Sequence, residues 1–397
     1  MRILVHDYAG HPFEVQLSRE LAARGHDVLH LYCGSTHTPR GALARSPSDP
    51  PTFDVRGVGL SQTIPKTSFI RRFQLESEYS RKLVAECESF NPDVILSANT
   101  PSIPGQKLAR WCVRSGVRLV SWIQDIYGLA AYRLLSRKLP IVGHAVGQYF
   151  IALDKWSARN SAALVVITED FRKVFTDWGI ESSRIHAIHN WAPLEEMPLR
   201  PRENDWSREK ALTPDLRLIY AGTLAMKHNP ALLLELARTL DRGERGELIV
   251  VSEGAGVEWL TEQAAAQGIK SLRCLGFQPF EALPDVLGSA DVLVAVLEAD
   301  AGVFSVPSKV LSYLCAGRPV LLAVPKENLA AKIVVESGAG LAVEPNDIAG
   351  FSAAAEQLIE SPERRTQCGQ AARHYAETHF DIGRIGDKFE AILTGTE

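Results

Sequence analysis

The sequence predicts an α/β protein made of two doubly wound domains, each a parallel sheet wrapped by helices. Strand-like apolar runs alternate with helix-like segments along the whole chain, which is typical of parallel sheets. The alternation falls into two series, separated by a stretch rich in proline and charge. With 397 residues, 46% of them hydrophobic, the chain can fill more than one core, so disorder and collagen-like structure are excluded.

The first series lies in residues 1–200. A helix follows the first strand, because Phe13, Leu17 and Leu21 recur every four residues and place one apolar face against the sheet. Gly25 then supplies the end of this helix. The expected strands of the first domain are residues 3–5, 28–31, 94–96, 119–122 and 164–167.

The second series predicts a second domain of the same class, with strands at residues 216–220, 248–251, 292–295 and 320–323. Residues 190–206 are the expected linker, because they are poor in aliphatic pattern. The expected divisions are therefore 1–200, 201–378 and a terminal helical segment, 379–397. Two such domains in tandem place their strand ends on either side of a cleft, where we expect the chemistry.

The charge of the chain narrows its function. A formal net charge of -4 and a pI near 6.3 argue against a general nucleic-acid binder, which usually has a strongly basic face. The charge is unevenly divided, with +5 in residues 1–200 and -9 in residues 201–397. We expect a cytoplasmic protein without a spanning helix, because neither a secretory signal pattern nor a run of about 18 apolar residues occurs.

A glycine turn follows the first strand of each expected domain. Gly10 precedes Pro12, which suits the first turn of a helix, and it lets a ligand approach N–H groups aimed at an anion; a tight turn explains it equally well. Gly222 and Thr223 lead to Lys227 just before the next helix, where a cation suits a diphosphate; the alternative is a solvated lysine. Neither turn has the GxGxxG pattern followed by an acid, which argues against a nicotinamide enzyme.

Two further segments carry candidate chemistry. The expected helix N-terminus at residues 306–309 offers N–H donors, the Ser308 hydroxyl and the Lys309 ammonium to one anion. In the first domain, Asp125 follows a strand, and it either positions or deprotonates an acceptor hydroxyl or caps a helix. His11 has a similar ambiguity as a turn histidine.

These motifs together resemble the retaining glycosyltransferases of family 4, which have the GT-B fold of two Rossmann-like domains. The likeness covers nearly the whole chain and is carried by Gly10 and residues 21–28, 163–168, 190–191, 222–227, 275–277, 283–284, 290–292 and 307–319. In these motifs the sequence is similar to bacterial surface-polysaccharide enzymes of the colanic-acid and L-fucosamine transferase type. The resemblance implies transfer of a sugar from a UDP- or GDP-sugar donor to a glycan acceptor, and a C-terminal helix that crosses back to the first domain.

The resemblance also implies roles for individual residues. Lys227 would bind the donor diphosphate, and Gly10 would close over it from the first domain. The remaining donor-binding residues would be Gly222, Thr223, Gly276, Phe277, Val306, Pro307, Ser308, Lys309 and Ser312.

The chain departs from the family at its paired glutamates. Aligned on residues 317–319, these fall at Phe304 and Ser312, neither of which is acidic. Ribose contact would then come from Ser312 or a neighbouring loop. Glu298 or Asp300 either replaces the first glutamate or is a surface acid.

A retaining transfer without a carboxylate nucleophile would use the leaving diphosphate to help deprotonate the acceptor. Lys227, Lys309 and helix N-termini would stabilise the departing charge, and Asp125 is the third candidate catalytic residue. Because no DxD-like motif lies in a suitable loop, we expect no metal or other cofactor in the chemistry.

Residues 129–159 alternate apolar side chains with cations, among them Arg133, Arg137 and Lys138. Such a stretch can lie in a bilayer interface, and the alternative is a core helix with a solvated basic edge. Because acceptors in the family are often lipid-linked diphosphate sugars, the resemblance favours a peripheral protein on the inner face of the cytoplasmic membrane.

Two other functions stay open at this point. A GT-B-fold nucleotide-sugar epimerase would need cleft acids and histidines suited to elimination chemistry. A non-catalytic nucleotide-sugar-binding protein would account for the missing acidic pair.

Overall fold

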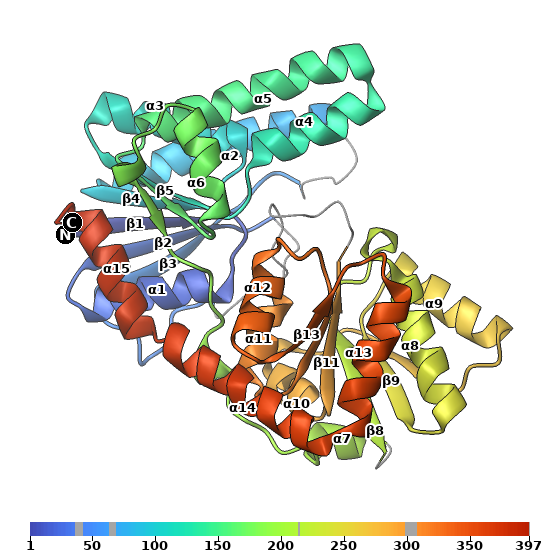
Figure 1. Ribbon diagram of the computed structural model, residues 1–397. Helices are drawn as coiled ribbons and strands as arrows, with labels where there is room; N and C mark the ends of the chain where they lie inside the picture. The colour runs from blue at the N-terminus through green and yellow to red at the C-terminus, as the bar shows by residue number, and fades with distance from the viewer. Residues whose placement is uncertain (36–42, 63–68, 213–214, 298–307, 397) are drawn as a thin grey trace. The chain divides into compact units, whose positions relative to one another are not determined.

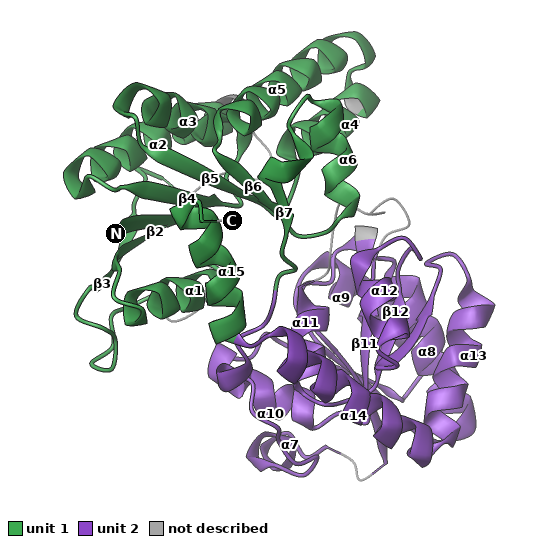
Figure 2. Ribbon diagram, turned by 60° about the vertical axis from the view of Figure 1, so that its left-hand side comes forward, with its two compact units in different colours: residues 1–190, 382–397 green, residues 191–381 purple. Residues whose placement is uncertain are grey.

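The computed structural model describes residues 1–35, 43–62, 69–212, 215–297 and 308–396, without the side chains of Phe69, Ile70, Lys138 and Lys227. It divides into two compact units (Figure 2). Unit 1 comprises residues 1–190 and 382–397, and unit 2 comprises residues 191–381. The division between them therefore falls ten residues before the expected boundary at 200, because Trp191 and Ala192 already pack as buried residues of unit 2.

Unit 1 contains a seven-stranded parallel sheet in the order β3-β2-β1-β4-β5-β6-β7 (Figure 1). The chain therefore reverses direction across the sheet between β1 and β4, which is the switch point of a doubly wound fold. The strands are β1 (Arg2–Asp7), β2 (Asp27–Cys33), β3 (Phe53–Val58), β4 (Val94–Ala98), β5 (Arg118–Ile123), β6 (Ala163–Val166) and β7 (Ile185–Ala187).

Helices cover the sheet of unit 1. In the first of them Pro12 occupies the first turn and Phe13, Leu17 and Leu21 are buried, as their spacing predicts. The helices are α1 (Pro12–Ala23), α2 (Phe69–Phe90), α3 (Ser102–Ser115), α4 (Tyr127–Lys138), α5 (Pro140–Asn160), α6 (Asp170–Asp177), the 3-10 turn η1 (Ser182–Arg184) and α15 (Ile382–Thr394).

The C-terminal helix α15 belongs to unit 1. Arg24 of α1's C-terminal end donates to Asp387 and Glu390, each at 2.7 Å, and the rings of Trp122 and Phe389 lie 4.7 Å apart. Phe389 is fully buried, so α15 closes the core of the unit rather than lying loosely on its surface.

Unit 2 contains a six-stranded parallel sheet in the order β10-β9-β8-β11-β12-β13, with its switch point between β8 and β11. Its strands are β8 (Leu216–Ala221), β9 (Gly246–Val251), β10 (Leu272–Leu275), β11 (Val292–Val296), β12 (Val320–Ala323) and β13 (Gly340–Val343). Its helices are η2 (Leu194–Glu196), α7 (Asp205–Glu209), η3 (Met226–His228), α8 (Pro230–Gly243), α9 (Ala255–Ala266), η4 (Phe280–Ala282), α10 (Leu283–Gly288), α11 (Lys309–Cys315), α12 (Leu329–Glu336), α13 (Ile348–Glu360) and α14 (Pro362–His379).

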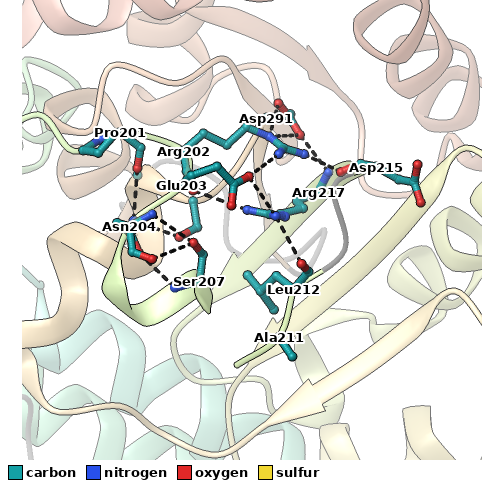
Figure 3. Close-up of polar contacts among 12 residues, drawn as sticks. Pro201, Arg202, Glu203, Asn204, Ser207, Ala211, Leu212, Asp215, Arg217 and Asp291 are labelled. Carbon is teal, nitrogen blue, oxygen red and sulfur yellow. Dashed lines mark hydrogen bonds and ion pairs between the residues drawn. The ribbon is translucent and has the colours of Figure 1, made fainter. Parts of the chain in front are cut away.

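The predicted linker is tied to unit 2 by a cluster of ion pairs (Figure 3). The side chain of Arg217, only 1% exposed, contacts Glu203 at 3.0 Å, while Arg202 donates to both carboxylate oxygens of Asp291 at 3.0 Å. Asn204 caps α7 by accepting from the Ser207 amide. The charges that marked this stretch as a linker therefore fix it in place.

Within the described residues, no helix combines the length and apolar character needed to cross a bilayer.

Candidate functional site

Two motifs that the sequence singled out in unit 2 meet at the switch point of its sheet. Gly222 follows β8, and Lys309 follows β11, the neighbouring strand. A Cβ on Gly222 would lie 3.2 Å from the Lys309 Nζ, and Gly222 has a φ of +123°, which disfavours any other residue. The turn and the cation are thus fitted to each other at the edge where doubly wound sheets bind ligands.

Tyr220 holds Lys309 against this turn. The Lys309 Nζ donates to the Tyr220 hydroxyl at 2.6 Å and lies 3.8 Å from the centre of the tyrosine ring. The hydroxyl in turn donates to the Thr223 carbonyl at 2.6 Å. No carboxylate in the described part of the chain pairs with Lys309, and desolvation lowers the pKa of Lys309 to about 7. An anion arriving here would restore the full charge.

The residues around Lys309 complete a polar edge. Ser308 is the exposed N-cap of α11, and its side chain makes no capping hydrogen bond. Ser312 is half-buried one turn later, and Thr223 is exposed on the glycine turn. Val306 and Pro307 lie outside the described residues, as does the side chain of Lys227, whose backbone belongs to η3.

A third element of unit 2 lies at the ends of β9 and β10. The Phe277 amide donates to Glu253 at 3.1 Å, and a Cβ on Gly276 would approach the same carboxylate oxygen to 3.0 Å. Phe277 is 52% exposed, a large fraction for an aromatic side chain. The glycine loop therefore presents a flat apolar surface, suited to stacking on a planar base.

In unit 1 the glycine turn after β1 is built differently from the expectation. Asp7 Oδ1 accepts the amides of Ala9 at 2.9 Å and Gly10 at 2.7 Å. The Gly10 N–H is therefore already donated to a buried carboxylate, as the tight-turn alternative requires, and any ligand approach at Gly10 stays a prediction. The φ of +81° at Gly10 is explained by the turn itself.

The carboxyl of Glu14 lies beneath the same turn, fully buried, and accepts from the Gln124 side-chain amide. Burial first, and then the neighbouring Asp7, raises the pKa of Glu14 well above its ordinary value. Among the described residues Asp7 Oδ2 and Glu14 Oε2 have no other hydrogen-bond partner, so a proton on Glu14 satisfies both oxygens.

A cavity of about 50 Å³ opens in unit 1 near the ends of β4 and β5, with room for about four water molecules. Its polar lining includes Asn99, Thr100, Ser102, Asp125, Tyr127 and Asp154. Asn99 has a left-handed φ of +46°, held where its side chain accepts from the Tyr127 hydroxyl at 2.8 Å. Hydroxyl and amide groups of this kind suit the hydroxyls of a sugar.

Asp125 is the sequence candidate that reaches this cavity. The residue is exposed, yet desolvation of the carboxyl raises its pKa to about 6. A carboxyl with this pKa is suited to accept a proton near neutral pH. The helix-capping alternative belongs instead to Asp154, which accepts the Gly128 amide at 2.6 Å in the first turn of α4.

Several site residues were missed from the sequence. Tyr220 was noted only as a strand residue, although a hydroxyl at the last positions of a strand is a signal for this edge of the sheet. Asn99 and Thr100 follow β4, the partner of β1 at the switch point, and strand order was needed to find them. His11 is the N-cap position of α1 but makes no side-chain cap, and its ring stacks on Phe13.

The described residues contain no cluster of three His, Cys, Asp or Glu side chains that could hold a metal ion.

Two parallel α/β units, each with ligand-type side chains at its switch point, and a C-terminal helix that joins the first unit, define the GT-B class of glycosyltransferases. Residues 15–191 match the family model described as a glycosyl transferase 4-like domain, and residues 202–375 match the model for glycosyl transferases group 1. The chain is a glycosyltransferase of the family 4 type.

Similar proteins include bacterial polysaccharide enzymes. WcaI of Escherichia coli strain K12, a glycosyl transferase assigned to colanic acid biosynthesis, is 25% identical over 77% of this chain and 75% of its own length. Among solved structures, sucrose-phosphate synthase from Thermosynechococcus elongatus has a TM-score of 0.75 at 16% identity, and Anabaena HepE in complex with UDP-glucose has a TM-score of 0.71 at 15% identity. Both matches cover the whole of both chains, and they show the shared fold.

Proposed function

We propose that the protein is a retaining transferase that moves a sugar from a nucleotide-sugar donor to a lipid-linked glycan acceptor during surface polysaccharide synthesis. The observation that carries the proposal is the Lys309 ammonium held against the Gly222 turn at the switch point of unit 2. A cation that no carboxylate of the described residues neutralises, next to a glycine turn, is suited to the diphosphate of a donor.

Donor binding would extend from this point along the ends of the strands. Lys309 and Lys227 contact the diphosphate, Ser308 and Ser312 contact sugar and ribose hydroxyls, and the base stacks on Phe277 beside Gly276. Val306, Pro307 and Thr223 provide backbone contacts. The proposed donor is a UDP- or GDP-sugar, and the complex of HepE with UDP-glucose supports a nucleotide-sugar ligand for this fold.

The reaction would proceed on one face of the sugar. The bond from the anomeric carbon to the diphosphate breaks, and its electron pair leaves with the diphosphate. The acceptor oxygen forms the new bond from the same face, and its proton passes to the departing phosphate oxygen. Lys309 and Lys227 stabilise the departing charge, and Asp125 accepts a hydrogen bond from the acceptor hydroxyl and orients it. We propose that this chemistry needs no metal.

The lipid-linked acceptor is supported by the similarity to WcaI, whose name places it in colanic acid synthesis, and by the composition of residues 129–159. A basic, apolar segment of this kind is suited to a peripheral position on the inner face of the cytoplasmic membrane.

The proposal is tested by incubating the protein with UDP-, GDP- and dTDP-sugars, with and without membrane lipid extracts, and analysing the products. Donor hydrolysis, and transfer to lipid, support the transferase. An isomerised donor would identify an epimerase instead, and tight binding without turnover would identify a binding protein.

The donor site is tested separately with Lys227→Ala. We expect a loss of about 10- to 150-fold in donor affinity, because a charge-assisted hydrogen bond contributes about 1.5–3 kcal/mol. Unchanged affinity would count against Lys227 as a diphosphate ligand.

A further inference from the structure

The basic, apolar segment of unit 1 forms a helical hairpin. The sequence led us to expect one stretch over residues 129–159, but the chain turns at Leu139 and Pro140, so that α4 and α5 run side by side in opposite directions (Figure 1). Three glycines allow their backbones to meet: a Cβ on Gly128 would approach Ile151 to 2.9 Å, one on Gly147 would approach Tyr132 to 2.6 Å, and one on Gly143 would overlap the Leu135 carbonyl.

The sheet topology shows which way the hairpin points. Helix α4 begins four residues after the end of β5, at the edge of the sheet where the strands end, and α5 leads into the start of β6 at the opposite edge. Because Gly128 lies level with Ile151, residues 152–160 of α5 run back toward the start of β6, and residues 140–150 project beyond the edge at which α4 begins. The projecting part is about 16 Å long at 1.5 Å per residue.

The exposed apolar side chains gather on this projecting part. Ile141 is 88% exposed, Val142 61% and Leu139 56%. Leu134, Val146 and Tyr149 of the same part are also among the exposed large hydrophobic residues of unit 1. Within the described residues these side chains stay exposed, and a cluster of exposed apolar side chains of this kind marks an interaction site.

The charge of the hairpin indicates which kind of partner fits the apolar tip. No acidic residue occurs between Asp125 and Asp154, whereas Arg133, Arg137 and Lys138 lie next to the tip, with both arginines exposed. A second copy docked symmetrically through the same tip would bring these like charges together. A bilayer with anionic lipids satisfies both features, because its hydrocarbon takes the apolar tip and its headgroups attract the cations.

We propose that the tip of the α4–α5 hairpin inserts end-on into an anionic lipid bilayer through Leu139, Ile141 and Val142. The hairpin then acts as a short stalk, because it projects from the same edge of the sheet as Asp125 and holds that edge near the membrane surface. The inference rests on the proposed function only for the role of insertion, which is to bring the enzyme to a lipid-linked acceptor. Insertion itself requires neither donor nor acceptor.

The test is co-sedimentation of the full-length protein with vesicles of phosphatidylcholine containing phosphatidylglycerol, compared with phosphatidylcholine alone. We expect the double variant I141D/V142D to lose about 100-fold or more in vesicle affinity, because each side chain loses the transfer of its apolar surface from water. The variant R133Q/R137Q should lose about 30-fold, and only for vesicles with anionic lipid. The matched control V335D/I348D changes two side chains of unit 2 that are 58% and 51% exposed, and it should bind as the wild type does.

All these positions are exposed, so the variants should keep the wild-type unfolding temperature and the wild-type rate of donor hydrolysis. Wild-type protein that stays in the supernatant, or equal loss in the tip and control variants, would overturn the inference. A tip variant that only converts a dimer to a monomer, with no change in vesicle binding, would also overturn it and would identify a second copy as the occupant. Vesicle binding, oligomeric state and unfolding temperature do not depend on transferase activity, so failure of the proposed function is distinguished from failure of insertion.

Discussion

Lys309 should couple donor binding to the uptake of a proton. In the unliganded protein its pKa is about 7, because desolvation disfavours the ammonium and no carboxylate within the described ranges compensates. A bound diphosphate supplies the missing negative charge and raises this pKa. If the pKa in the complex is about 9 or higher, affinity for a nucleotide sugar falls about tenfold between pH 6 and pH 8. The nucleotide sugar itself carries a constant charge over this range, so the slope reports on the protein.

The assay is isothermal titration of the best-binding nucleotide sugar at several pH values, repeated in buffers of different ionisation enthalpy to count protons. Lys309→Met should weaken binding about 10- to 150-fold at pH 6 and remove the slope, whereas Lys270→Met, at the opposite edge of the sheet before β10, should change neither. The free energy of unfolding of the unliganded protein should rise with pH, whereas donor affinity falls. Since the native pKa lies below the unfolded value, the unliganded wild type gains stability relative to Lys309→Met as pH rises from 7 toward 10. A wild-type affinity that is independent of pH, or a slope that survives in Lys309→Met, would refute the reasoning.

Three further outcomes are expected. Asp125→Asn should lower the rate of transfer about 100-fold or more without changing donor affinity, and wild-type turnover should rise as pH passes through about 6. A loss of donor affinity as large as the loss of rate would contradict the assignment of Asp125 to the acceptor. Glu14→Gln should remove a loss of stability that the wild type shows as pH rises from the unfolded pKa of about 4.3 toward the raised native pKa, because only the unfolded state releases its proton in this range; thermal unfolding should show the two proteins differing least below about pH 4. Arg217→Leu should lower the free energy of unfolding of unit 2 by about 1–3 kcal/mol in urea unfolding; this value is kept low because the partner Glu203 is exposed and solvent weakens the ion pair. The control Arg242→Leu, at an exposed position, should stay within about 0.5 kcal/mol of wild type.

The parts of the structure set by local pattern were predictable from the sequence. Apolar runs located nine of the strands that the structure describes but not β3, β7, β10 and β13, which lie at or near the sheet edges. Pro12 with the periodic Phe13, Leu17 and Leu21 located α1. Gly222 was predicted as a glycine turn after a strand and Lys309 as part of a helix N-terminus, but the contact between them was not predicted. Predictions of this kind succeed because the spacing of apolar residues and the residues that form turns are properties of a few neighbouring positions in the sequence.

Features that depend on which side chains meet were not predictable. Gly10 has the sequence of an anion-binding turn, but Asp7, three residues earlier, takes its amide, and only the folded geometry reveals this. The hairpin was read as one amphipathic stretch, because its glycines have no pattern until α4 and α5 are placed together. Tyr220 carries no signal from which its hydrogen bond to a lysine 89 positions away could be inferred.

The two switch points have opposite electrostatics, and this assigns them different ligands. In unit 1 the buried carboxylate of Asp7 takes the free amides of the first turn, and Glu14 adds a second carboxyl beneath it, so a diphosphate would meet acids where a phosphate site normally presents N–H groups. In unit 2 the corresponding turn meets the ammonium of Lys309. A charged donor is therefore favoured at unit 2, and uncharged hydroxyls of an acceptor at the polar cavity of unit 1. Contact of Gly10 with a donor would use its lack of a side chain rather than its amide, which Asp7 already accepts, so Gly10→Ala should weaken donor binding in the isothermal titration.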